Sequence, residues 1–186
     1  MNRAVRMFES IKRQISNLGS DNRGVSAIEF AMLLPLMMTL YLGTVEVSQG
    51  IGADRKVTLT ARTICDLVSQ VSSIGNADMT NALNASSAVM TPYPVSNLKV
   101  TVSSVKIDAT GKATIVWSDT LNGTARTAGS TITLPTALNV ANTYLIFSEV
   151  QYTYKPTIGY VVTGTLTLKD QIYMRPRLSD SVTRTS

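Results

Sequence analysis

Histidine is absent from this 186-residue chain, and cysteine occurs only once, at Cys65. A chain without histidine lacks the commonest general base and the commonest metal ligand. A single thiol also excludes an internal disulfide framework. We therefore expect no catalytic residue, no metal or cofactor site, no small-molecule substrate and no enzyme. Cys65 is expected to be a small buried side chain, with an intermolecular disulfide as the alternative.

Charge is sparse, since 16% of the residues are charged and 44% are hydrophobic. Of the net charge of +5, residues 1–24 carry +3, directly before the most apolar segment, and the remaining 162 residues carry +2. The basic residues of this leader are Arg3, Arg6, Lys12, Arg13 and Arg23, against Glu9 and Asp21. Basic residues do not alternate with aromatic ones, as a surface for single-stranded nucleic acid requires. We expect no nucleic-acid partner.

A membrane-spanning helix is predicted directly after the leader. Residues 30–45 read FAMLLPLMMTLYLGTV, 16 residues without a charge. A bilayer core needs about 20 mainly apolar residues, so we place the span at residues 25–47, with Glu29 and Glu46 near its two ends. Its expected membrane-embedded residues are Phe30, Leu33, Leu34, Pro35, Leu36, Leu40 and Leu42.

The basic leader also predicts the orientation of this span. Five basic residues precede the apolar segment, whereas only Arg55, Lys56 and Arg62 follow it closely. The positive-inside rule then places the N-terminus in the cytoplasm and the later residues outside. A secretory signal cleaved near Gly50 or Gly52 and a plain uncleaved signal anchor are the alternatives.

A short motif at the start of the apolar segment distinguishes these alternatives. Residues 23–30, RGVSAIEF, place a glycine five positions before Glu29-Phe30. This pattern resembles the processing site of type IV prepilins, in which a membrane-embedded peptidase removes the leader on the cytoplasmic side. The resemblance implies cleavage between Gly24 and Val25. Glu29 can then neutralise the new α-ammonium group of its own or a neighbouring subunit.

The resemblance is closer to one branch of that superfamily. Residues 23–70, with Leu34-Pro35 followed by Gly43 and Glu46, are similar to the N-terminal region of TadE-like pseudopilins of tight-adherence (Flp) pili. Residues 102–123 and 173–177 resemble the same family more loosely. This resemblance implies a minor pilin-like subunit whose partners are the inner membrane, prepilin peptidase, other pilin or pseudopilin subunits and the pilus assembly platform.

Periodicity predicts an α+β fold for the exported part. Apolar residues recur at helical steps of three and four after the span, so the helix is expected to continue over residues 48–75. These residues are Val57, Ala61, Ile64, Val68 and Val71. A second short helix is predicted over residues 78–90, although its Asn and Ser content disfavours it.

Alternating apolar residues predict about four antiparallel strands in the domain at residues 76–178. Two form a hairpin over residues 98–118, with a bulge at Ser103-Ser104; the others cover residues 144–155 and 163–174. Residues 119–140 are predicted to be a loop and residues 179–186 a loose tail. The expected architecture is pilin-like: a transmembrane helix continues as an amphipathic helix that packs on the sheet.

Three function classes remain from the sequence. The first is a structural subunit of a pilus system that stays in the inner membrane or enters a surface pilus. The second is a signal-anchored periplasmic binding module unrelated to pili. The third, a soluble secreted hydrolase, is disfavoured because the chain has no histidine and its one thiol has no candidate base.

Overall fold

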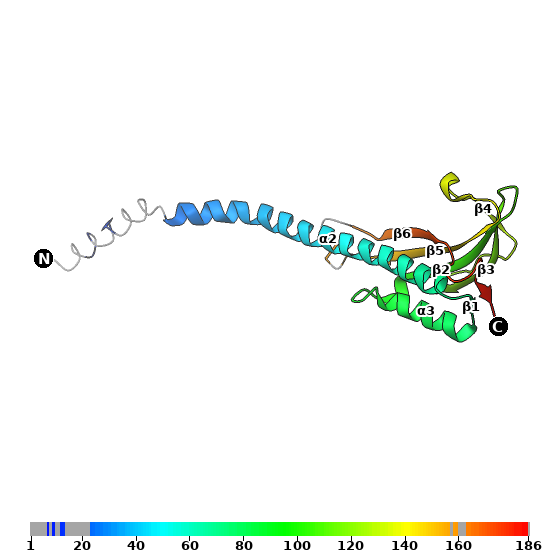
Figure 1. Cartoon of the computed structure of the whole chain (residues 1–186). Coiled ribbons are helices and arrows are strands. Elements are labelled where there is room, and N and C mark those ends of the chain that lie inside the picture. The colour runs from blue at the N-terminus through cyan, green and yellow to red at the C-terminus, as the bar shows by residue number, and fades with distance from the viewer. Residues whose placement is uncertain are drawn as a thin grey trace. The chain divides into compact units, whose positions relative to one another are not determined.

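The computed structural model describes residues 7, 9, 12, 13, 23–156, 158–159 and 163–185. The chain divides into two compact units, Met1–Val45 and Glu46–Ser186. The first unit contains the apolar segment. The second contains the predicted exported domain, which has the expected α+β architecture (Figure 1).

Helix α2, Arg23–Ser69, is the longest element, with 47 residues and Pro35 inside it. The part of α2 within the second unit is amphipathic because Ala53, Val57, Ala61, Ile64 and Val68 are fully buried. Their spacing of three or four residues places them on one face. This confirms the predicted stripe up to Val68, and the helix ends earlier than residue 75.

The end of α2 is fixed by contacts that are distant in sequence. The backbone N–H of Arg177 donates to the carbonyl of Ser69 at 2.8 Å. That bond satisfies one of the carbonyls left without a partner at a helix C-terminus. The chain then forms strand β1, Ser73–Ile74, and helix α3, Asn76–Ala88. Helix α3 exists despite its polar composition because Met79 and Leu83 are buried against the core.

Within the described part of the chain, the main sheet has five strands in the order β4-β3-β2-β5-β6, with every neighbouring pair antiparallel. The strands are β2 (Leu98–Ile107), β3 (Ala113–Leu121), β4 (Thr131–Ile132), β5 (Thr143–Tyr154) and β6 (Leu166–Met174). Short 3-10 turns lie at Val95–Asn97 and Thr136–Leu138. The hairpin and the two later strands are as predicted, while β4 lies in the segment predicted to be a loop.

The predicted bulge is present, but its extra residue lies in β3. Ser104 pairs with Trp117 and Val105 pairs with Ile115, so Val116 has no partner in β2. Strand β2 itself pairs with β5 without interruption. The apparent shift in the apolar pattern of β2 therefore has another cause.

That cause is a second core on the opposite face of the sheet. Near its start β2 buries Leu98, Val100 and Val102 against the helices, whereas Val105 and Ile107 belong to a separate cluster with Ile115, Leu145 and Phe147. Leu134 and Leu138, from the segment between β3 and β5, pack against this second cluster. A single strand thus changes the face that it buries along its length.

The C-terminal segment differs from the loose tail that the sequence predicts. Strand β7, Thr183–Arg184, pairs in parallel with β1, and Val182 is buried in the main core. The indole N–H of Trp117 donates to the carbonyl of Val182 at 2.8 Å. These contacts attach the C-terminal segment to the rest of the domain. The prediction of a loose tail from its polar composition was therefore wrong.

Candidate functional site

The predicted processing segment lies at the beginning of α2. Gly24 and Val25 are helical and exposed, and a Cβ atom added at Gly24 would meet nothing within 4 Å. Glu29 and Phe30 are exposed as well. The four residues therefore share one accessible stretch of about two helical turns.

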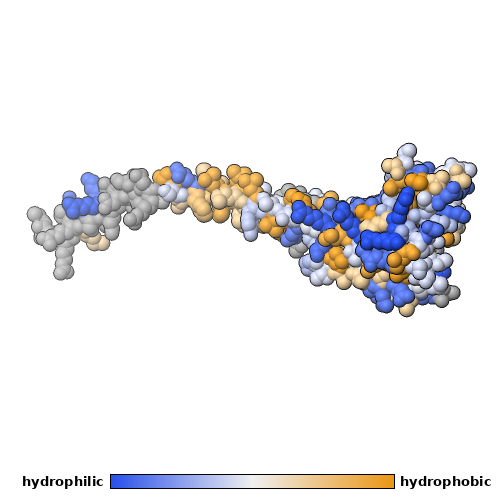
Figure 2. All heavy atoms as spheres, in the orientation of Figure 1, coloured by the Kyte–Doolittle hydropathy of each residue, from blue (hydrophilic) through white to orange (hydrophobic). Residues whose placement is uncertain are grey.

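The apolar part of α2 after this segment is exposed on all sides. Exposed large side chains include Phe30, Met32, Leu33, Leu34, Leu36, Met37, Met38, Leu40 and Tyr41. Figure 2 shows apolar side chains gathered along this stretch of the first unit. Among the described residues, one helix is long and apolar enough to cross a membrane, and its most apolar window is not buried by any part of the protein. A helix that is apolar all round requires a nonaqueous environment or other apolar helices.

The second half of α2 is attached to the sheet by hydrogen bonds as well as by packing. The hydroxyl of Ser148 donates to the carbonyl of Ala61 at 2.8 Å, and the thiol of Cys65 donates to the carbonyl of Ile146 at 3.2 Å. Cys65 is fully buried, as predicted. Burial raises the pKa of the Cys65 thiol to about 12, so the thiolate needed for redox chemistry does not form near neutral pH.

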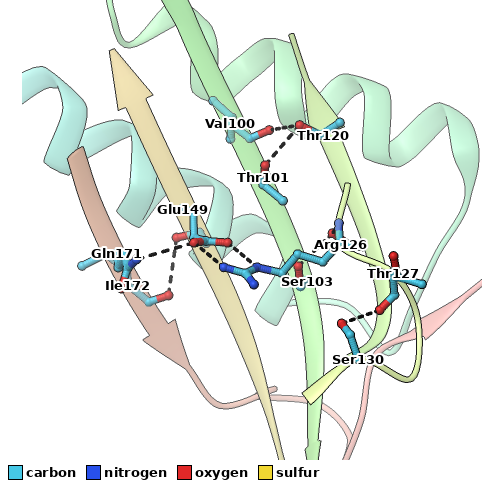
Figure 3. Close-up of polar contacts among 12 residues, drawn as sticks. Val100, Thr101, Ser103, Thr120, Arg126, Thr127, Ser130, Glu149, Gln171 and Ile172 are labelled. Carbon is cyan, nitrogen blue, oxygen red and sulfur yellow. Dashed lines mark hydrogen bonds and ion pairs between the residues drawn. The ribbon is translucent and has the colours of Figure 1, made fainter. Parts of the chain in front are cut away.

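The sheet face opposite the helices carries a polar cluster that the sequence alone did not indicate (Figure 3). Arg126, from the segment after β3, donates from Nε and Nη2 to the two carboxylate oxygens of Glu149 at 2.6 and 2.7 Å. The guanidinium also lies 5.5 Å from the centre of the Phe147 ring, which stacks on Tyr173. The hydrogen bonds to Glu149 raise the pKa of Arg126, and burial raises the pKa of Tyr173.

A groove of about 350 Å³ runs beside this pair. Its lining includes Lys99, Thr101, Gln151 and Lys169 from the three strands β2, β5 and β6. Charged and amide side chains therefore line much of this groove. No three His, Cys, Asp or Glu residues of the described part of the chain lie close enough together to hold a metal ion.

The site residues predicted on the helix lie where the sequence places them, whereas the polar cluster on the sheet face was not predicted. Gly24, Val25, Glu29 and Phe30 are brought together by helical spacing alone, which sequence reasoning can follow. Arg126 and Glu149 are separated by 23 residues and lie in different elements. Only strand register could have placed them together, and residues 119–140 were predicted to be loop.

An apolar helical segment continues into an amphipathic half that packs on an antiparallel sheet, as the sequence predicts. Residues 24–65 match the family model described as TadE-like protein. This match agrees with the resemblance found over residues 23–70. The matched region begins at Gly24 and lies wholly within α2. No curated protein and no solved structure matches the chain.

Proposed function

We propose that this protein is a minor pilin-like subunit, a pseudopilin, for the assembly of Flp (tight-adherence) pili, and that prepilin peptidase matures it by cleavage after Gly24. The observation that carries the proposal is the TadE-like match, which starts at the proposed cleavage site and continues through the exposed apolar helix. In this proposal, residues 1–24 are a cytoplasmic leader, residues 25–47 span the inner membrane, and the rest of the chain is periplasmic.

The geometry at Gly24 supports cleavage. A peptidase must approach the backbone closely and draw it out of the helix. Gly24 has no side chain to obstruct that approach, and the space around its Cα is open. Glycine also favours a helix less than alanine does, by about 1 kcal/mol. The beginning of α2 is therefore easier to unwind at Gly24 than it would be with any residue except proline.

Glu29 has a defined role once the leader is removed. Cleavage creates an α-ammonium group on Val25, and an unpaired charge is costly near the hydrocarbon layer. The exposed Glu29 carboxylate lies one helical turn further along and can neutralise that charge in its own or a neighbouring subunit. Pairing between subunits would draw apolar helices together in register, with Phe30 and the leucines at their contact.

The function proposed here is structural and not enzymatic. Partners are other pilin or pseudopilin subunits and the assembly platform, reached through the apolar half of α2 and through the polar sheet face around Arg126 and Glu149. Whether the mature subunit stays in the membrane or enters a surface pilus depends on those contacts. The alternative is a signal-anchored periplasmic binding module, which retains its leader and does not need Glu29.

The test is the N-terminal sequence of the protein isolated from membranes of wild-type and prepilin-peptidase-deficient cells. We expect Val25 as the first residue in wild-type cells and an uncleaved leader in the deficient strain. Gly24→Val should block cleavage, whereas the matched control Ser26→Val adds a branched side chain two residues later and should be processed. An uncleaved leader in wild-type cells would support the anchored binding module.

A second variant separates processing from assembly. Glu29→Gln keeps the size of the side chain and removes its charge, so we expect a normally cleaved, membrane-inserted protein that fails to support piliation. Normal piliation by a cleaved Glu29→Gln protein would contradict the role of the carboxylate.

A further inference from the structure

An apolar cleft of about 300 Å³ lies in the second unit at the beginning of its part of α2. Its helical wall is formed by residues between Glu46 and Asp54, and its other wall by Tyr154 of β5 with Leu166 and Leu168 of β6. Val47, Ile51 and Leu166 are 50%, 52% and 42% exposed, respectively. Large aliphatic side chains that remain this exposed around one cleft mark a site for an apolar partner.

A buried hydroxyl in the cleft wall has no hydrogen-bond partner among the residues that the structure describes. Tyr154 is only 4% exposed, and its hydroxyl oxygen is among the described buried polar atoms that are left unsatisfied. Leaving a buried hydroxyl unpaired is unfavourable, because the group has lost its hydrogen bonds to water. A molecule that enters the cleft with a hydrogen-bond acceptor removes this cost, so the occupant is expected to be apolar with one polar acceptor.

The residues that line the cleft directly follow the proposed membrane span, and this position indicates which kind of apolar molecule can reach it. If residues 25–47 span the hydrocarbon layer, as proposed above, the cleft begins where the span ends. The four helical steps from Val47 to Ile51 rise about 6 Å, and the headgroup layer on each side of a bilayer is about 5–7 Å thick. This layer is also where tyrosine is enriched in membrane proteins, with its ring in apolar surroundings and its hydroxyl near polar groups.

The charge at the cleft indicates which lipid headgroup it can accept. Asp54 contributes to the lining and is exposed to solvent. Carboxylates repel an anionic headgroup and attract an ammonium group. The two ends of one molecule would then be recognised, with an acyl chain against the aliphatic wall and an ammonium group near Asp54.

From this cleft we infer a binding site for a zwitterionic phospholipid with an ammonium headgroup, such as phosphatidylethanolamine, in the outer leaflet of the inner membrane. The upper part of an acyl chain lies against Val47, Ile51 and Leu166, and an ester carbonyl accepts a hydrogen bond from Tyr154. The bound lipid holds the exported domain at the membrane surface. This inference rests on the membrane span of the proposed function and not on the cleavage of the leader.

The test uses the full chain reconstituted in phosphatidylethanolamine-containing vesicles. A polarity-sensitive fluorophore is attached at Leu166→Cys, and the matched control carries it at Leu178→Cys, which replaces a side chain that is 73% exposed and lies outside the cleft. The buried Cys65 does not compete for the label. We expect blue-shifted emission at residue 166, quenched by phospholipids brominated near the ester, and water-like emission at residue 178.

A second measurement examines the hydrogen bond. Tyr154→Phe removes only the hydroxyl, and Tyr144→Phe makes the same change elsewhere on β5. Native mass spectrometry of the protein released from detergent should show about three- to tenfold less retained phosphatidylethanolamine for Tyr154→Phe, which is the range for one neutral hydrogen bond. Tyr144→Phe should retain as much as the unmodified protein.

Different failures have different meanings. Equal, water-like emission at residues 166 and 178 in a chain that resists alkaline extraction would overturn the lipid site and leave the membrane span intact. Release of the chain by alkaline extraction would overturn both. A blue shift that disappears when the protein is diluted into excess lipid would identify a second copy as the occupant and overturn the lipid site. Equal lipid retention by both phenylalanine variants would also count against it.

Discussion

Replacing Arg184 by alanine removes the side chain that fastens the C-terminal segment to the sheet. Its Nε donates to Asp119 at 2.8 Å, its Nη2 to the side-chain oxygen of Asn76 at 2.6 Å and its Nη1 to the carbonyl of Ile74 at 3.2 Å. One guanidinium thus connects strand β3, helix α3 and strand β1. The hydrogen bonds to Asp119 raise the pKa of Arg184, so the group is charged throughout the range in which the protein is studied.

The contacts of Arg184 set the expected size of the loss in the free energy of unfolding. A hydrogen bond to a charged group contributes a net stabilisation of about 1.5–3 kcal/mol. The side chains of Arg184 and Asp119 are 20% and 26% exposed, so water replaces part of what is lost. We expect Arg184→Ala to lower the free energy of unfolding of the second unit by about 2 kcal/mol. For a domain of this size that is a fall of about 4–8 °C in melting temperature.

The assay follows from the single tryptophan of the chain. Trp117 is 8% exposed and bonded to Val182, two residues before Arg184, so its fluorescence reports detachment of the tail. Denaturant unfolding of the full chain in detergent is compared for Arg184→Ala and for Arg62→Ala, which removes an exposed arginine of α2. A loss below about 0.5 kcal/mol, no larger than an ordinary surface replacement gives, would refute a structural role of the tail.

Two further predictions concern single residues. The thiol of Cys65 should resist maleimide at pH 8 until the protein is unfolded. Because burial raises its pKa from 9.0 to about 12, the stability contributed by the protonated thiol is complete below about pH 9 and is lost as the pH rises towards 12. Rapid labelling of the folded protein would contradict this burial. Gly111→Ala should destabilise the β2-β3 hairpin by about 1–3 kcal/mol, since it forces alanine to a φ of +82°. Unchanged denaturant unfolding would show that the turn adapts.

Local patterns were sufficient to predict several elements of this fold. The stripe from Val57 to Val68 follows from helical periodicity, and the hairpin follows from alternation on either side of Thr110-Gly111. At that turn, the Asp108 carboxylate accepts hydrogen bonds from the backbone N–H groups of Thr110 and Lys112, at 2.8 and 3.0 Å. Such signals act between neighbours in sequence, so no knowledge of the tertiary structure was needed.

Other features depend on which surfaces meet, and alternation alone misplaced them. Strand β2 buries one face near Val100 and the opposite face near Val105, because helices cover one side of the sheet and the segment before β5 covers part of the other. A pattern that changes face resembles a bulge in the strand that carries it. The extra residue is Val116 in the partner strand.

The sequence by itself determined the membrane-type helix, the motif from Gly24 to Phe30 and the α+β class, because each depends on composition or on spacing along one element. Only the tertiary structure decided the Arg126–Glu149 pair, the attachment of the tail by Arg184 and the cleft beside Tyr154. Each of these joins residues from separate elements. Their distances depend on strand order, register and the packing of α2, which no local pattern specifies.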